Sequence, residues 1–199
     1  MPSADTPKPG LRELKKARTR SEIQRQALRL FRRQGYAATT IEQIAAAAEV
    51  SQSTFFRYFP TKEDVVLWDE YDPRFLAALQ AQPPDLPPIA ALRQAMRGVF
   101  AELSEEQLDL ERDRGRLITN EPDLRARSLS VTLDSVKMLG DALAERLGRD
   151  PGDFAVRNLV GAVFGAMFTA WLAMAEEENP DIVGTMDAAL EHLEKGLPL

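Results

Sequence analysis

The chain has 199 residues, of which 44% are hydrophobic, and this size suits one good core or a small domain joined to a larger one. It contains no cysteine, which excludes a disulfide framework and thiol chemistry and fits a reducing cytoplasm. The net charge of −6 is uneven: residues 1–60 carry 11 Lys and Arg against 5 Asp and Glu, whereas residues 61–199 carry 14 against 26. We therefore expect only the first third to meet a polyanion, although charge alone would equally suit a solvated basic surface.

The N-terminal segment 1–19 is a basic arm that we expect to be partly disordered, mainly before Leu11. Its polar, proline-rich start lacks an apolar stretch, so we expect no signal peptide. Arms of this kind can enter a minor groove of DNA, and we expect Arg18 to contact DNA. The alternative is a helix extension with a solvated face.

The first core-facing helix is indicated by helical spacing, which recurs along the chain while period-two alternation is absent. Ile23, Ala27, Leu30 and Phe31 form its apolar stripe, and Gly35 ends it. The sequence therefore predicts an all-α fold, with about nine helices.

The next helices follow at short spacing. Residues 40–43 match a capping box that begins the second helix. Ser51 is a good N-cap for a short third helix, which Pro60 ends. Thr61 caps a fourth helix that we expect to run to about Gln82, before a stiff break at 83–88. Further helices are expected at about 89–106, 108–119, 121–147, 151–177 and 181–196.

The third helix carries four aromatic side chains but can bury only one face. Phe55 and Phe59 are four residues apart and should pack inward. The outward face holds an amide, a hydroxyl, an aromatic ring and a guanidinium, on Gln52, Ser53, Phe56 and Arg57. Such groups can pair with base edges or phosphates. Tyr58 could reach a phosphate, and Lys62 lies beside free N–H groups that suit an anion.

Residues 20–65 resemble the DNA-binding domain of the TetR family of bacterial transcriptional regulators, and residues 112–127 resemble a stretch seen in many actinobacterial members. The matching residues are Phe31, Gly35, Tyr36, Thr39, Thr40, Ile44, Ala45, Ala48, Val50, Ser51, Thr54, Phe59, Lys62 and Glu63. The resemblance implies that Thr40 and Tyr58 contact phosphates and that Lys62 holds the DNA backbone. It also implies that Gln52 and Ser53 face bases.

Two positions depart from the family pattern. Phe56 stands where a tyrosine usually contacts a phosphate, and Glu49 stands where a glycine often makes the turn. The complete set of DNA-binding residues that we expect is Arg18, Thr39, Thr40, Ser51, Gln52, Ser53, Phe56, Arg57, Tyr58 and Lys62.

The resemblance also implies the domain organisation. Residues 20–65 would form a three-helix, helix-turn-helix DNA-binding domain, and residues 66–199 a helical domain for effector binding and dimerisation. Gly161 and Gly165 let another backbone come close, which favours a dimer core, with packing inside one chain as the alternative. With the apolar stripe of the last helix, the expected homodimer interface is Gly161, Gly165, Ile182, Met186, Leu190 and Leu193.

A ligand pocket is expected among the helices between residues 89 and 177. Arg112 or Arg116 could pair with an anionic group if it points inward, and a solvated ion-pair face is the alternative. The other candidates are apolar and could equally be core residues. The candidate lining is Phe100, Leu103, Arg112, Arg116, Leu117, Met138, Phe164, Met167, Phe168 and Trp171.

An enzyme is not indicated, because the single histidine, His192, has no nucleophile or metal-ligand pattern around it. We expect no catalytic residue, metal or cofactor. The apolar run 159–175 reads as a buried helix, so we expect a cytoplasmic protein without membrane contact. The expected function is a sequence-specific transcriptional regulator, a repressor released from a palindromic double-stranded DNA operator by a small apolar or amphipathic ligand. The alternatives are a ligand-independent regulator or architectural DNA-binding protein and, third, a helical interaction adaptor.

Overall fold

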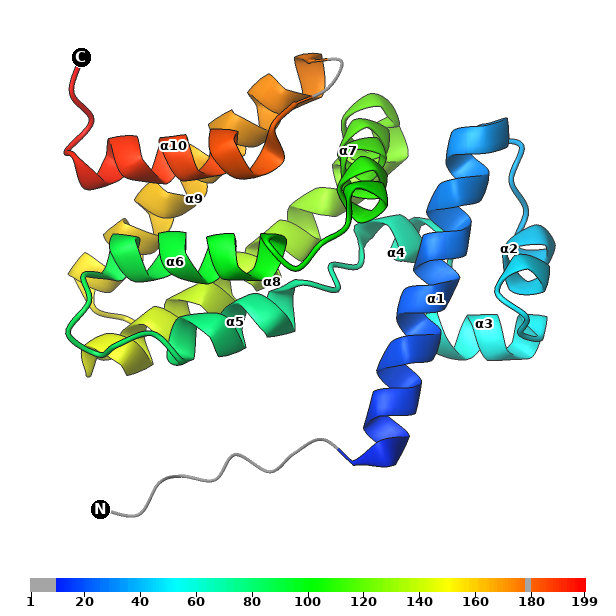
Figure 1. The fold of residues 1–199 in the computed structure, drawn as a ribbon, viewed down its shortest axis with the longest axis horizontal. Helices are drawn as coiled ribbons and strands as arrows, with labels where there is room; N and C mark the ends of the chain where they lie inside the picture. The colour runs from blue at the N-terminus through cyan, green and yellow to red at the C-terminus, as the bar shows by residue number, and fades with distance from the viewer. Residues whose placement is uncertain (1–9, 178–179) are drawn as a thin grey trace. The chain divides into compact units, whose positions relative to one another are not determined.

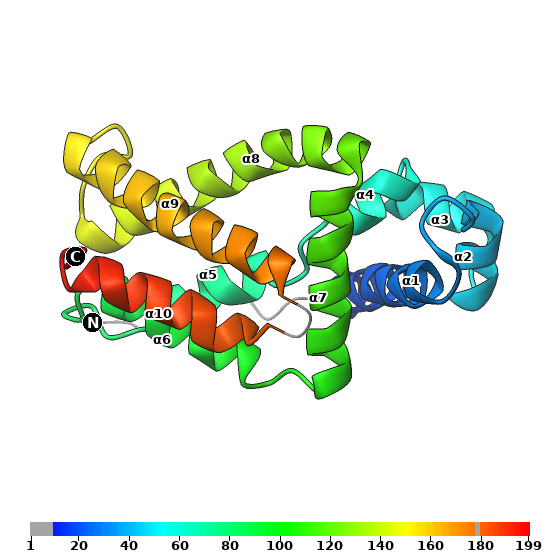
Figure 2. The same ribbon diagram turned by 90° about the horizontal axis from the view of Figure 1, so that it is seen from above.

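The computed structural model describes residues 10–177 and 180–199, and within them the fold is all-α, with ten helices (Figures 1 and 2). The chain divides into two compact units, residues 1–66 and residues 67–199. Each unit has its own buried core.

The first unit contains α1 (Leu11–Gln34), α2 (Ile41–Ala47), α3 (Gln52–Tyr58) and most of α4 (Lys62–Leu67). Helix α1 begins at Leu11, so residues 11–19 form the first turns of a helix with a largely exposed surface, which is the alternative that the sequence left open for the arm. The basic side chains of these turns remain exposed to solvent. The expectation of disorder before Leu11 falls mainly on residues 1–9, outside the described residues.

The core of the first unit is built from the apolar stripes of its helices. Ile23, Ile44, Phe55 and Phe59 are completely buried. The side chain of Gln24 is buried as well and donates a hydrogen bond of 2.8 Å to the carbonyl of Val65. This bond satisfies two polar groups in the core and fixes α1 to α4.

The second unit begins with a break that the sequence did not predict. The expected fourth helix, from 61 to about 82, is divided into α4 and α5 (Asp72–Gln80). Between them, the carboxylate of Asp69 accepts a hydrogen bond of 2.8 Å from the backbone N–H of Tyr71, and Pro73 occupies the first turn of α5. A proline suits that position but not a helix interior, and the break follows from it.

The remaining helices are α6 (Pro88–Phe100), α7 (Glu105–Asn120), α8 (Pro122–Leu147), α9 (Phe154–Glu176) and α10 (Ile182–Glu194). Helix α6 ends six residues earlier than expected, because Ser104 and Gln107 form a capping box that begins α7. This Ser-x-x-Gln signal is present in the sequence.

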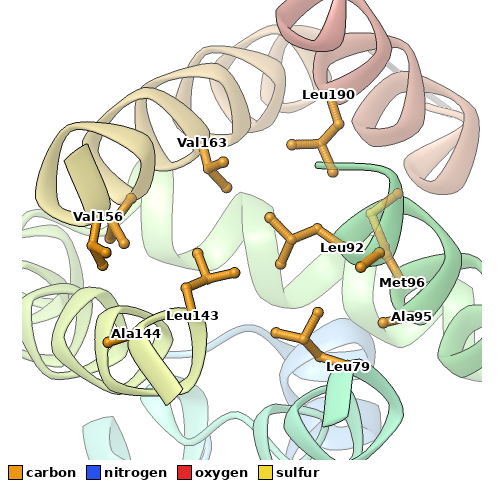
Figure 3. Packing of buried hydrophobic residues seen from close by; sticks show 11 residues of the cluster. Leu79, Leu92, Ala95, Met96, Leu143, Ala144, Val156, Val163 and Leu190 are labelled. Atoms are coloured by element: carbon orange, nitrogen blue, oxygen red, sulfur yellow. The ribbon is translucent and has the colours of Figure 1, made fainter. Parts of the chain in front are cut away.

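The core of the second unit joins α5, α6, α8, α9 and α10, and Figure 3 shows its side chains meeting from these helices. Leu92 and Leu143 lie among Val163 and Leu190 (Figure 3). The buried cluster is Leu79, Ala91, Leu92, Ala95, Met96, Leu143, Ala144, Val156, Val160, Val163 and Leu190. Arg93 adds a polar clamp, donating to both carboxylate oxygens of Asp187 at 2.9 and 3.0 Å and so holding α10 against α6.

Helices α8 and α9 leave apolar side chains in solvent. Leu129 and Leu133 of α8 are 63% and 61% exposed. Among the described residues, α9 is the one helix long and apolar enough to cross a membrane, a test that core helices of soluble proteins also pass.

Candidate nucleic-acid interface and internal cavity

Helices α2 and α3 are placed by local hydrogen bonds. Thr40 begins α2 with a complete capping box, in which its hydroxyl accepts from the N–H of Gln43 and its own N–H donates to the Gln43 side chain. Ser51 begins α3 and accepts from the N–H of Thr54 at 3.1 Å. Between the helices, Glu49 adopts a left-handed backbone conformation with φ of 54°. A glycine would adopt this conformation without strain, so Glu49 keeps the turn at some cost.

Helix α3 has the two faces predicted from its sequence. Phe55 and Phe59 are fully buried, whereas Phe56 is 48% exposed and packs edge-on against Phe55, with ring centroids 5.6 Å apart. The side chains of Gln52, Ser53 and Arg57 are also exposed. The outward face therefore offers an amide, a hydroxyl, a ring and a guanidinium on a rigid support.

Thr39 corrects the expected contact list. It is 2% exposed, and its hydroxyl donates to the carbonyl of Gly35 at 2.8 Å, so it holds the loop after α1 and cannot reach DNA. Ser51 stays exposed, but its hydroxyl is engaged in capping α3.

Lys62 is held by several contacts within the first unit. Its ammonium donates to the carbonyls of Tyr36 at 2.8 Å and Thr39 at 3.1 Å, and lies 4.2 Å from the centre of the Tyr36 ring. An ammonium has three N–H groups, and these two bonds leave one for a further acceptor. Lys62 thus fastens the loop before α2 to the start of α4.

A basic hollow lies between the first turns of α1 and the end of α3. It is lined by Leu11, Arg12, Glu13, Lys15, Lys16, Arg57 and Tyr58. The guanidinium of Arg57 stands 5.5 Å from the centre of the Tyr58 ring. Three basic residues of the N-terminal segment, Arg12, Lys15 and Lys16, belong to this lining, whereas Arg18 is exposed but lies outside it. Their spacing of three and four residues puts Arg12, Lys15 and Lys16 on one side of the helix.

The second unit contains a partly open cavity of about 290 Å³. Its apolar lining includes Phe75, Leu92, Met96, Val99, Phe100, Ile118, Leu139, Val163, Met167, Trp171, Met174, Ala175, Pro180, Ile182, Met186 and Leu190. Among the predicted pocket residues, Phe100, Arg112, Arg116, Met167 and Trp171 belong to the lining. Leu103, Leu117, Met138, Phe164 and Phe168 do not. Phe168 is 46% exposed, with its ring stacked between those of Phe164 and Trp171.

One wall of the cavity is charged. The guanidinium of Arg114 bonds the carboxylates of Glu111 at 2.8 Å and Asp69 at 3.0 Å. Asp72 accepts from the hydroxyl of Ser135 at 3.4 Å. Burial, together with the charge of Asp69, raises the pKa of Asp72 from 3.8 to about 6.

The two arginines proposed as anion ligands are bonded to protein groups. Arg112 donates to the carbonyl of Pro180 at 3.0 Å and to the carboxylate of Asp109 at 2.5 Å. Arg116 donates to the carbonyl of Glu177 at 3.2 Å. Both therefore hold the chain between α9 and α10 against α7. No group of three His, Asp or Glu side chains suited to a metal ion occurs in residues 10–177 and 180–199.

The expected dimer interface is divided by the structure. Ile182 and Leu190 are buried inside their own chain, and Met186 lines the cavity, so the stripe on α10 is core rather than a free surface. Leu193 packs against the same core. Gly161 and Gly165, in contrast, face open space on α9. The exposed stripe of α9 repeats at intervals of four and three residues and comprises Phe154, Asn158, Gly161, Gly165, Phe168 and Leu172.

Comparison with known families agrees with both units. Residues 23–67 match the family described as "Bacterial regulatory proteins, tetR family". Residues 86–198 match the domain described as "MftR C-terminal domain". The chain belongs to the TetR family of bacterial transcriptional regulators. It is therefore a helix-turn-helix DNA-binding regulator, and α2 and α3 are its helix-turn-helix.

Two curated relatives are actinobacterial regulators. The chain is 35% identical to the HTH-type transcriptional regulator TcmR of Streptomyces glaucescens, over 93% of this chain and 87% of that protein. It is 25% identical to the putative mycofactocin biosynthesis transcriptional regulator MftR of Mycobacterium tuberculosis, over 86% of this chain and 87% of the relative. Both relatives are named as regulators rather than as enzymes.

Solved structures show the same TetR fold. Thermus thermophilus FadR, a TetR-family repressor in complex with lauroyl-CoA, is 30% identical with a TM-score of 0.53, over 90% of this chain and 95% of that one. The SmeT–triclosan complex is 23% identical with a TM-score of 0.59, over 90% and 91% of the two chains.

Proposed function

We propose that this TetR-family regulator is a cytoplasmic repressor that binds a palindromic operator as a homodimer and is released by a small molecule held in the cavity of residues 67–199. The observation that carries the proposal is that one chain combines an exposed polar reading helix with a separate, largely apolar cavity. DNA binding alone requires no such cavity.

Operator recognition would use the outward face of α3. Gln52 and Ser53 stand at its first turn, where side chains can reach base edges, and Phe56 can pack on a thymine methyl group. Thr40, Arg57, Tyr58 and the third N–H of Lys62 would bind phosphates. The basic hollow at the start of α1 would add phosphate contacts and strengthen the salt dependence of binding.

The homodimer would form through α9, with α8 beside it. A strip containing Phe154, Phe168 and Leu172 is unusual on a monomer surface, and the two glycines within it permit close approach of backbones. This assignment replaces α10 with α8, because the apolar side of α10 is used within the chain. The same dimer would cover the apolar surface of α9, which supports a cytoplasmic rather than a membrane location.

Release would depend on the chain between α4 and α5. Asp69, Tyr71 and Asp72 line the cavity, and Asp69 is two residues beyond the end of α4. A ligand that displaces these side chains can therefore shift α4 and, through it, the spacing of the two reading helices. Coupling free energies of about 1–3 kcal/mol, or about 5- to 150-fold in affinity, are typical of such control. The 30% identical FadR holds a ligand, lauroyl-CoA, which supports a ligand for this chain as well.

The operator can be identified by selecting random duplex DNA with the full chain and footprinting the best sequence. We expect two inverted half-sites with centres about one helical turn apart, roughly 34–36 Å, because a two-fold dimer presents two copies of α3. A footprint over one asymmetric half-site would contradict the proposed dimeric recognition. A ligand-independent DNA-binding protein is the second candidate, and it would keep its affinity for this operator in the presence of any cavity ligand.

A further inference from the structure

The effector cavity combines an adaptable apolar body with an electronegative wall. Four of the six methionines of the chain line it, namely Met96, Met167, Met174 and Met186. Methionine side chains adjust to ligand shape at low cost. Tyr71 and Phe100 both line the cavity, and their rings stack with centroids 6.1 Å apart. Aromatic rings attract cations to their faces. The volume of about 290 Å³ is at the small end of ligand pockets, which span about 300–1,000 Å³.

The arginines of the lining are poor partners for an anion, because protein acceptors already engage them. Arg114 is held by Glu111 and Asp69, with its side chain only 14% exposed. Arg112 is held by Asp109 and by Pro180. An anionic ligand would have to break these charge-assisted bonds and leave carboxylates without their partner, which costs free energy.

The lining as a whole has three carboxylates and three arginines, but around Arg114 the carboxylates outnumber the cations. Arg114 forms ion pairs with Asp69 and Glu111, whereas Asp72 accepts a hydrogen bond from the uncharged hydroxyl of Ser135. Burial raises the pKa values of both Asp72 and Glu111. A bound cation would supply the missing positive charge.

We propose that the cavity takes an amphipathic cation, whose apolar body packs among the methionines and aromatic rings and whose ammonium or amidinium group meets Asp72. This inference rests on the proposed effector function and narrows it to one class of ligand. It replaces the anion-binding role considered for Arg112 and Arg116 in the sequence.

Three probes that share one apolar body separate the effect of charge from that of shape: 4-phenylbutylammonium, 4-phenylbutanol and 4-phenylbutyrate. Calorimetric titration of the full chain at pH 7.5 should give the tightest binding for the ammonium, by about tenfold over the alcohol, with the carboxylate weakest. Asp72→Asn should remove the tenfold preference and leave binding of the alcohol unchanged. Asp85→Asn, an exposed aspartate outside the cavity lining, is the matched control and should behave as the parent protein does.

Unfolding of the Asp72→Asn variant is not expected to account for a lost preference for the ammonium probe. The pKa of Asp72 in the folded chain is above its ordinary value of 3.8, so the folded state binds more protons between about pH 4 and 6 and loses stability as the pH rises through that window. At pH 7.5, Asp72→Asn removes a buried negative charge and should melt at the same or a higher temperature.

The outcomes distinguish this inference from the function on which it rests. If 4-phenylbutanol or 4-phenylbutyrate binds best, or if Asp72→Asn keeps the preference for the ammonium, the cation assignment is wrong while the effector cavity stands. If none of the three probes binds, both the cation assignment and the proposed effector cavity are contradicted.

Discussion

Lys62 shows how one residue can serve the fold and the DNA at once. Its ammonium is bonded to the carbonyls of Tyr36 and Thr39, which fixes the loop before α2, and one N–H is left for a phosphate. The family resemblance predicted the phosphate role, but the intramolecular bonds depend on the tertiary contact between α4 and that loop. No local sequence pattern predicts this contact.

Lys62→Ala should therefore have two effects. We expect the free energy of unfolding to fall by about 1.5–3 kcal/mol, because two charge-assisted hydrogen bonds are lost. Binding should weaken alike for every DNA sequence, with a salt slope smaller by about one. Gln52→Ala should instead change which bases are preferred, at unchanged stability.

Chemical denaturation measures the free energy of unfolding, and DNA binding at several salt concentrations measures the salt slope. An unchanged salt slope in Lys62→Ala would restrict Lys62 to its structural role.

At the scale of elements, the helix-turn-helix was predictable because its signals are local. The capping box at Thr40, the cap at Ser51 and the spacing of Phe55 and Phe59 act within four residues. The same local signals predicted which residues of α3 face outward. The cavity lining was predicted only in part, since five of the ten predicted residues lie elsewhere. Part of its acidic wall comes from the break between α4 and α5, which was not predicted.

The apolar stripes of α9 and α10 show the limit of periodicity. Both indicate helices that must bury one face, but neither indicates whether the partner is the same chain or a second copy. The structure uses the stripe of α10 inside the chain and leaves that of α9 exposed. The α10 residues of the predicted interface therefore pack within their own chain, while the role of α9 in dimerisation stays a prediction.

Gly165→Leu tests the dimer surface on α9. A side chain at this position meets open space within the chain, and leucine favours helix over glycine by about 1 kcal/mol, so the monomer should fold at least as well. Close approach of two α9 helices would be blocked, and we expect monomers in sedimentation velocity. Gly98→Leu, on α6, also meets open space and should remain dimeric. A dimeric Gly165→Leu protein would place the interface elsewhere.

At the scale of the whole molecule, the proposed release by a ligand requires that the cavity of the second unit controls the DNA affinity of the first. The physical basis of this control is the covalent link between the cavity and α4, since Asp69, Tyr71 and Asp72 line the cavity and follow α4 closely in the chain. The ligand must bind the released state more tightly than the operator-bound state, because equal affinity for both would shift nothing.

The most direct test is the anisotropy of a labelled operator during titration with whichever phenylbutyl probe binds most tightly. We expect saturating probe to weaken operator binding of the parent protein by about 5- to 150-fold. Ala175→Leu fills part of the cavity and should need more probe, whereas Ala188→Leu, on the exposed side of α10, should respond as the parent does. If calorimetry shows the probe bound while operator affinity stays unchanged, the cavity does not control DNA binding and the account is contradicted.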